Sequence, residues 1–173
     1  DNEGETYPYR GQGIRIPTLE EIYKRFPDYP VNIEIKNTES SIAQPICEII
    51  RENKMQNKTL VVSFFDERMA EFRQICPEVA TAAARNEITK FVILNYIFMG
   101  GLYSPAEVAF QVPESSSGIL VVRPGFISGA HNRNVQVHVW TPNTREEIQK
   151  FIDIGVDGIM SDRPDILMEL LGR

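Results

Sequence analysis

Apolar residues recur along this chain at two alternating spacings, and the alternation predicts a succession of strands and helices. Strands are predicted at residues 31–36, 59–64, 79–84, 108–112, 135–141 and 158–160. Helices are predicted at residues 41–54, 66–75, 87–98, 126–132, 144–154 and 164–171, after a first helix that ends before Pro27. Strand–helix alternation with short connections is typical of an α/β fold with a mainly parallel sheet.

The faces of two predicted strands separate two architectures that fit this alternation, an open doubly wound sheet and a (β/α) TIM-type barrel. An open sheet covered by helices needs central strands that are apolar on both faces. The strands at 31–36 and 135–141 each have one polar face, made of Asn32, Glu34 and Lys36 in the first and Gln136, His138 and Trp140 in the second. We therefore favour a barrel, with a site at the carboxyl ends of its strands.

Several helix starts are marked by residues that cap exposed backbone N–H groups. Thr18 and Glu21 have the spacing of a capping box, in which each side chain bonds the backbone of the other residue. Asp66 is expected to cap the helix at 66–75. Asp162, together with Ser161, is expected to cap the last helix.

The composition indicates one globular domain over residues 1–173. The chain has 173 residues, of which 42% are hydrophobic and 24% charged, and this suits a single apolar core. Asp and Glu number 24 against 18 Lys and Arg, a net charge of -6. Because the basic residues are also scattered, nucleic-acid binding is disfavoured.

The sequence leaves the cellular compartment open. Cys47 and Cys76 are too few for a disulfide framework and fall in predicted apolar helices, so both are expected as buried free thiols. Residues 1–15 are predicted as a loop without a signal-peptide pattern, although a secreted or periplasmic location is compatible with a native start further upstream. The apolar run at 91–103 is shorter than the ~20 residues that span a bilayer.

Glu34 and Lys36 are the sharpest candidates for chemistry, because they lie two apart on one strand and point the same way. A carboxylate is a hard oxygen ligand for Ca²⁺ or Mg²⁺, and an adjacent ammonium neutralises a phosphate oxygen. A solvated edge strand with an incidental ion pair explains the same pattern equally well.

Other candidates are weaker. Trp140, the only tryptophan, could stack on a substrate at a barrel mouth or pack in the core. His138 is expected as a buried, hydrogen-bonded structural residue and His131 as a surface residue. Ser63 ends a predicted strand and could contact a ligand, but no nucleophile-elbow motif surrounds it.

Four blocks in this order identify a resemblance that covers the chain from about Tyr7 to its end. They are Tyr9-Arg10-Gly11 through Ile16-Pro17-Thr18-Leu19-Glu20-Glu21, then Asn32-Ile33-Glu34-Ile35-Lys36, then Val137-His138-Val139-Trp140-Thr141-Pro142-Asn143, and finally Gly155-Val156-Asp157-Gly158-Ile159-Met160-Ser161-Asp162-Arg163-Pro164. With them the chain resembles the glycerophosphodiester phosphodiesterase family, whose fold is a (β/α)₈ barrel.

The resemblance implies a role for three residues. Glu34 matches a carboxylate that binds the catalytic divalent cation, Ca²⁺ or Mg²⁺. Lys36 matches the lysine that faces the substrate phosphate, and Trp140 matches the aromatic residue that lines the glycerol pocket. The implied reaction is metal-dependent hydrolysis of a glycerophosphodiester to glycerol 3-phosphate and an alcohol.

The sequence also departs from the family pattern. The family's His-Arg-Gly and Glu-x-Asp motifs and a following His-Asp precede the equivalent of Tyr7 and do not occur here. We therefore expect an N-terminally truncated, incomplete barrel with about six of the eight strands, lacking the first two βα units. The isolated chain is expected to be inactive, because neither acid–base histidine is present. Coding sequence upstream of Asp1 would distinguish this enzyme from a non-enzymatic, degenerate barrel used for binding.

Two surfaces are expected to meet partners. The apolar run at 91–103 is read either as a buried helix or as an exposed patch beside the barrel mouth that accepts an acyl chain or touches a membrane. The second reading fits a lysophospholipase D-type variant acting on a lysophospholipid. The strands of Glu34 and Met160 would be open edges, which favour an oligomer or a separate segment filling the gap.

Overall fold

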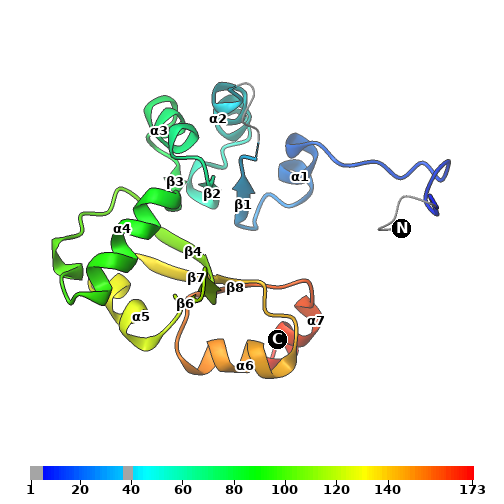
Figure 1. Ribbon diagram of the computed structural model, residues 1–173. Helices are drawn as coiled ribbons and strands as arrows, with labels where there is room; N and C mark the ends of the chain where they lie inside the picture. The colour runs from blue at the N-terminus through cyan, green and yellow to red at the C-terminus, as the bar shows by residue number, and fades with distance from the viewer. Residues whose placement is uncertain (1–5, 37–40) are drawn as a thin grey trace.

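The computed structural model describes residues 6–36 and 41–173 and has an α/β architecture (Figure 1). Its strands are β1 (Val31–Glu34), β2 (Thr59–Val62), β3 (Ala80–Thr81), β4 (Ala109–Pro113), β5 (Ser115–Ser116), β6 (Ile119–Leu120), β7 (Gln136–Trp140) and β8 (Gly158–Met160). Its helices are α1 (Leu19–Arg25), α2 (Ala43–Glu52), α3 (Asp66–Ile75), α4 (Arg85–Tyr96), α5 (Pro124–His131), α6 (Arg145–Asp153) and α7 (Pro164–Leu170), with short 3₁₀ turns η1 (Gln56–Lys58) and η2 (Gly100–Leu102). The first five residues of the predicted N-terminal loop lie outside the described residues.

Six strands run parallel and follow one another in chain order. β1, β2 and β3 form one three-stranded sheet, and β4, β7 and β8 form a second. A parallel bridge between Ala82 and Ala109 joins the two sheets, supported by a bond from Val108 N–H to Thr81 O of 2.9 Å. This confirms the predicted parallel α/β arrangement, and the order lacks the reversal found in a doubly wound sheet. The antiparallel hairpin β5–β6 was not predicted, because two-residue strands leave no periodic pattern.

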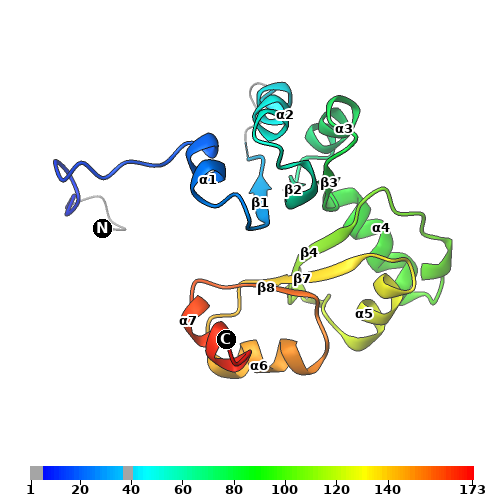
Figure 2. The same cartoon turned by 180° about the vertical axis from the view of Figure 1, so that it is seen from behind.

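The apolar faces of the strands pack against the helices, as their alternation predicts. Ile35 on the first sheet belongs to one buried cluster with Ile46 and Ile50 of α2. Val137 and Val139 of β7 are fully buried in a second cluster with aromatic residues of α4, α5 and α6, namely Phe91, Phe126 and Phe151. Figure 2 shows α2 and α3 beside the first sheet and α4, α5 and α6 around the second. The opposite strand faces carry the polar residues.

One cap prediction is confirmed and two are wrong. At α1, Glu21 N–H donates to Thr18 Oγ1 at 3.3 Å and Thr18 N–H donates to Glu21 Oε2 at 2.9 Å, which completes the capping box. Asp66 is instead the first residue of α3, and its Oδ1 accepts from Asn86 N–H of α4 at 3.0 Å. The cap position of α7 is Arg163, because tertiary partners hold Ser161 and Asp162 instead.

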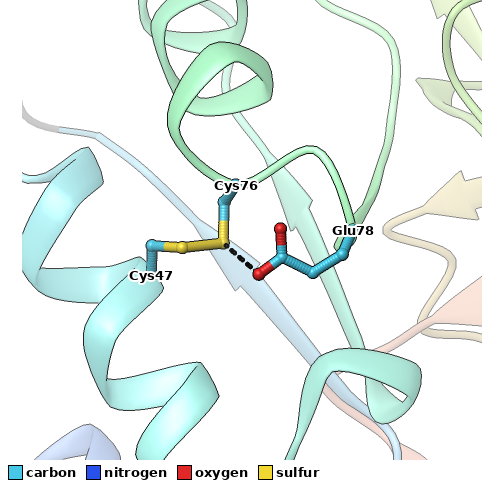
Figure 3. A group of neighbouring side chains, drawn as sticks. All are labelled: Cys47, Cys76 and Glu78. Atoms are coloured by element: carbon cyan, nitrogen blue, oxygen red, sulfur yellow. Dashed lines mark hydrogen bonds between the residues drawn. A yellow bond between two sulfur atoms is a disulfide. The ribbon is translucent and has the colours of Figure 1, made fainter.

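The prediction of two free thiols is wrong, because Cys47 and Cys76 form a disulfide (Figure 3). Cys47 lies on α2 and Cys76 follows α3, and these helices pack together so that the two Cα atoms are 5.8 Å apart. Both side chains are buried, as expected. Glu78 Oε1 lies 3.8 Å from Cys76 Sγ and accepts a bond of 2.6 Å from Arg51 Nε. The two cysteines are 29 positions apart in sequence, and only the packing of the two helices brings them together. Local sequence patterns therefore did not predict the pairing.

The apolar run at 91–103 is partly buried helix and partly exposed loop. Phe91 and Tyr103 are buried, whereas Phe98 is 98% exposed and Leu102 69% exposed. α4 starts at the carboxyl end of β3 and η2 precedes the start of β4, so the exposed part lies toward the amino ends of the strands. Of the two readings, the buried helix holds for the first part of the run. The alternative reading, an exposed patch beside the barrel mouth, is wrong about the position of the exposed part. Within residues 6–36 and 41–173, no helix is both long and apolar enough to cross a bilayer.

Candidate functional site at the carboxyl ends of the strands

A cavity of about 400 Å³ lies at the carboxyl ends of the parallel strands. Parallel strands bring residues far apart in sequence to one edge, and this edge is where α/β folds place their sites. The cavity is lined by Asn32, Glu34, Lys36, Val62, Phe64, Ala83, Gln111, Trp140, Thr141, Met160, Ser161 and Asp162. The structure therefore brings together all three residues proposed from the sequence for metal and substrate binding, Glu34, Lys36 and Trp140. Their roles stay predictions.

Glu34 and Lys36 form an ion pair at the rim of this cavity. Lys36 Nζ lies 3.3 Å from Glu34 Oε2, and the two side chains are 78% and 34% exposed respectively. The predicted strand continues only to Glu34, so Lys36 stands two residues beyond its end. An exposed pair of this kind contributes at most about 1 kcal/mol to stability. Both charges are therefore available to exchange their partner for a bound phosphate or cation.

Trp140 ends β7 and forms an aromatic wall with Phe64. Their ring centroids are 6.0 Å apart at 81°, an edge-to-face contact. Phe64 is 38% exposed, so an apolar surface faces the cavity next to the ion pair. Sequence reasoning missed Phe64, although its place at the carboxyl end of the strand predicted at residues 59–64 was the available indication. A polar charge pair beside an aromatic wall suits a ligand with an anionic group and a carbon skeleton.

A wider hollow of about 760 Å³ adjoins the cavity and shares Glu34, Lys36 and Phe64 with it. It extends over the starts of α3 and α4, where Phe65, Asp66 and Arg85 line it. Phe65 is 43% exposed. Both charge signs and an aromatic surface therefore surround the entrance.

A chain of side-chain hydrogen bonds runs below the cavity from the first sheet to the second. The side-chain amides of Asn32 and Gln111 form two hydrogen bonds with each other, of 3.3 and 3.2 Å, and Gln111 is 6% exposed. Gln111 Nε2 also lies 3.3 Å from His138 Nδ1, and His138 Nε2 lies 3.1 Å from Gln136 Oε1. Because Asn32 precedes Glu34 by two residues on one face, this chain positions the strand that carries Glu34.

His138 is a hydrogen-bonded structural residue, as expected. Burial lowers the pKa of its imidazole, and the negative charge of Asp157 only partly opposes this. A Cβ on the facing Gly158 would come within 2.7 Å of the ring, so the glycine makes room for it. The ring lies one layer below the cavity and between amide partners, so it supplies no acid or base at the rim.

His131 is exposed, as predicted, and lies at the end of α5 away from the cavity. Its Nε2 lies 2.8 Å from Asp157 Oδ2, which also accepts from Val137 N–H at 2.8 Å. Burial of Asp157 acts against ionisation, but these two hydrogen bonds outweigh it and lower the pKa of the carboxyl group. This cluster fixes the loop before β8 and takes no part in the site.

Ser63 is fully buried and already bonded, so it does not contact a ligand in the cavity. Its hydroxyl donates to Ile35 O at 2.7 Å and accepts from Phe65 N–H at 3.2 Å. It thereby ties the ends of β1 and β2 together just below Lys36. The hypothesis of ligand contact is wrong because this position faces the backbone of the neighbouring strand.

Asn143 joins the loops after β7 and β8, a role that sequence reasoning missed. Its Oδ1 accepts from Ser161 Oγ at 3.1 Å and from Asp162 N–H at 2.9 Å. Its Nδ2 donates to Asp162 Oδ2 at 2.9 Å. This explains why Ser161 and Asp162 do not cap α7, and it fixes the rim beside Trp140.

The described residues do not form a complete site for a divalent cation. Ca²⁺ and Mg²⁺ take about six or more oxygen ligands, several of them carboxylates. In the described part of the chain, the one cluster of three ligand side chains is Cys47, Cys76 and Glu78, where the disulfide occupies both sulfurs. Two carboxylates line the cavity. Glu34 is paired with the exposed ammonium of Lys36, whereas Asp162 accepts a hydrogen bond from Asn143.

Comparison with known proteins places this chain in a family. A sequence model described as "Glycerophosphoryl diester phosphodiesterase family" matches residues 1–166. "Probable glycerophosphodiester phosphodiesterase 2" of Mycobacterium tuberculosis is 31% identical over 170 residues, 93% of this chain and 62% of the relative. Lysophospholipase D GDPD1 of Rattus norvegicus is 26% identical over 186 residues, 94% of this chain and 59% of the relative. The chain thus spans about three fifths of the length of these curated relatives.

Two solved structures share the fold. A glycerophosphodiester phosphodiesterase from Parabacteroides distasonis superposes with a TM-score of 0.70 at 19% identity, covering 90% of this chain and 64% of that one. A phosphodiesterase from Oleispira antarctica, solved in complex with the product sn-glycerol-3-phosphate, has a TM-score of 0.62 at 17% identity over 91% of this chain and 62% of that one. The match of nearly the whole sequence, on a parallel α/β fold, shows that this chain belongs to the glycerophosphoryl diester phosphodiesterase family.

Proposed function

We propose that this chain forms the Glu34–Lys36–Trp140 side of a metal-dependent site that hydrolyses a glycerophosphodiester to glycerol 3-phosphate and an alcohol. One observation carries the proposal: side chains from β1, β7 and their following loops line a single cavity at the carboxyl ends of the strands. Membership of the family supports it, and so does the related phosphodiesterase that was solved with sn-glycerol-3-phosphate.

Each residue has a role that its chemistry fits. The Lys36 ammonium would balance the charge on the phosphoryl oxygens, and its exposure leaves it free to reach them. Trp140 and Phe64 would contact the carbon skeleton of glycerol. Glu34 would give one oxygen ligand to Ca²⁺ or Mg²⁺, an ion that in such enzymes stabilises negative charge on phosphoryl oxygens.

The same proposal includes an incomplete barrel. β1 and β8 each have one strand neighbour among the described residues. We infer that further strands would lie between them, contributed by polypeptide outside residues 1–173 or by a second chain in an oligomer. The remaining cation ligands and the acid–base groups would come from those strands. The 173-residue chain alone is then expected to bind ligands without turnover.

The single tryptophan makes binding directly measurable. We expect sn-glycerol 3-phosphate, titrated in the presence of Mg²⁺ or Ca²⁺, to change the fluorescence of Trp140. Lys36→Gln should weaken the apparent affinity roughly ten- to hundredfold, since a charge-assisted contact is lost. Lys24→Gln, which changes an exposed lysine of α1, is the matched control.

Two outcomes would contradict the proposal. If Lys36→Gln and Lys24→Gln weaken the apparent affinity for sn-glycerol 3-phosphate equally, Lys36 does not bind the phosphate. Cation-dependent release of glycerol 3-phosphate by the pure 173-residue chain would contradict the inference that it lacks acid–base groups. Binding without hydrolysis in a longer form that restores all strands would favour a degenerate barrel used for binding.

A lysophospholipid is the second candidate substrate, as in a lysophospholipase D. Curated relatives of that name match this chain, and the hollow beside the cavity exposes two aromatic side chains, Phe64 and Phe65. An acyl chain could lie along them. Comparing the effects of glycerophosphocholine and lysophosphatidylcholine on Trp140 fluorescence, in wild type and Phe65→Ser, tests this. Loss of only the lysophospholipid response would favour the lipid substrate.

A further inference from the structure

An exposed apolar turn follows α4 and is held in a defined conformation. Phe98 is 98% exposed, Leu102 69% and Ile97 54%. Backbone bonds order the turn, including one of 2.7 Å from Met99 N–H to Leu94 O. Phe98 has φ of 59°, a left-handed conformation that is unfavourable for a bulky residue. The apolar side chains of this turn are therefore exposed to solvent although the backbone at Phe98 is strained. Such strain is frequent at functional positions.

A basic pocket of about 340 Å³ lies beside this turn, between α4 and α5. Phe98, Arg123 and Arg133 line it together with the neutral polar residues Asn95, Ser128 and Asn132, and no carboxylate does. Within residues 6–36 and 41–173, neither arginine lies within ion-pair distance of an acidic group.

The donors of the two arginines are only partly used. Arg123 Nη2 donates to Asn95 Oδ1 at 2.7 Å, and its guanidinium stacks 4.1 Å from the centre of the Tyr96 ring. Its Nε is buried and has no hydrogen-bond partner in the described structure. Arg133 Nη1 donates to Gly101 O at 2.6 Å. The pocket thus holds two unneutralised positive charges next to an apolar tip.

The charges of the chain are segregated around this surface. The protein has a net charge of -6, yet residues 88–106 and 115–145 contain no Asp or Glu. Lys90, Arg123 and Arg133 lie in these two stretches. The exposed apolar turn of this acidic protein thus lies in a stretch of sequence without acidic residues, beside the two arginines of the pocket. Such a combination is complementary to an anionic surface with an apolar interior.

The surface lies away from the candidate active site. Arg85 at the start of α4 lines the hollow at the carboxyl ends of the strands, whereas η2 and Arg133 precede the amino ends of β4 and β7. Figure 1 shows the end of α4 and the segment after it at the far side of the molecule from β1. The pocket beside the turn shares no lining residue with the two hollows that Glu34 lines, so this surface is separate from the candidate active site.

We propose that residues 97–102, with Arg123, Arg133 and Lys90, attach this domain to bilayers that contain anionic phospholipids. Phe98, Ile97 and Leu102 enter the boundary between headgroups and acyl chains, while the arginines contact lipid phosphates. This attachment does not rest on the proposed hydrolysis, because it uses none of the residues at the cavity.

Vesicle co-sedimentation with the full 173-residue chain tests the proposal. We expect binding to vesicles of mixed phosphatidylcholine and phosphatidylglycerol, weaker binding to phosphatidylcholine alone, and a decrease as salt is raised. Phe98→Asn should reduce partitioning about tenfold or more, and asparagine tolerates the left-handed conformation, so the fold is retained. Arg133→Gln should reduce binding to the vesicles that contain phosphatidylglycerol and leave binding to the phosphatidylcholine vesicles unchanged.

Matched controls and contrary outcomes are available within the chain. Ile16→Ser removes a side chain that is 91% exposed elsewhere and should leave binding unchanged, as should Lys24→Gln. Absence of binding to anionic vesicles overturns the proposal, and so does equal binding by wild type and Phe98→Asn. A dimer in light scattering that Phe98→Asn dissociates, without vesicle binding, would assign the surface to a second copy of the chain and also overturn it.

Discussion

The disulfide between Cys47 and Cys76 gives a stability prediction whose size follows from chain length. The bond joins residues 29 apart in sequence, and closing a loop of that length lowers the entropy of the unfolded chain. The loop-entropy relation gives about 3.6 kcal/mol at 25 °C. For a chain of this size, that corresponds to a shift of roughly 7–14 °C in Tm.

The perturbation is the double substitution Cys47→Ala and Cys76→Ala. We expect its free energy of unfolding to be about 3–4 kcal/mol lower than that of the oxidised wild type. Urea unfolding, monitored by the fluorescence of Trp140, measures this difference. A reducing agent should lower the stability of the wild type by a similar amount and leave the double variant unchanged. This control separates the cross-link from the packing of two buried side chains.

Two results would refute the reasoning. Thiol titration of the denatured, unreduced protein should find no free thiol, and two free thiols would show that the bond does not form. Equal unfolding free energies for the oxidised wild type and the double variant would show that the loop constraint does not control stability.

Three further predictions concern the interior, the acid range and the exposed turn. Gln111→Leu should lower the free energy of unfolding by about 1–3 kcal/mol, because Asn32 and His138 lose a buried partner; urea unfolding checks this, with Gln44→Leu as an exposed control. Asp157 has a lowered pKa in the folded state, so its stabilisation is present above its ordinary pKa of about 4 and is lost as pH falls through the folded value. The Tm difference between wild type and Asp157→Asn should therefore narrow as the pH falls below about 4, and a constant difference would contradict the ionised contact. Phe98→Asn should raise the free energy of unfolding by up to about 1 kcal/mol, because it relieves the left-handed strain, and an unchanged denaturation midpoint would show that no strain is present.

Elements and faces were predictable because they depend on local periodicity. The six parallel strands were anticipated to within about two residues at most ends, and the polar face of residues 31–36 does hold Asn32 and Glu34 toward the cavity side. The capping box at Thr18 was predictable for the same reason, since all of its partners lie within three residues.

Partnerships across the fold were not predictable in this way. Ser63, Ser161 and Asp162 were assigned from their neighbours in sequence, yet each side chain also has a hydrogen-bond partner 18 to 28 positions away. A small polar side chain takes whichever donor or acceptor the packing brings nearest. Local spacing therefore identifies such residues without identifying their partners.

The sequence by itself determined the parallel α/β fold, the resemblance to the family and the candidates Glu34, Lys36 and Trp140. The tertiary structure alone decided that these three line one cavity with Phe64, that Cys47 and Cys76 pair, and that the apolar turn at Phe98 lies at the opposite end from the cavity. The reason is physical. Periodicity fixes which face of an element is buried, whereas strand order and helix packing fix which distant residues meet at one edge.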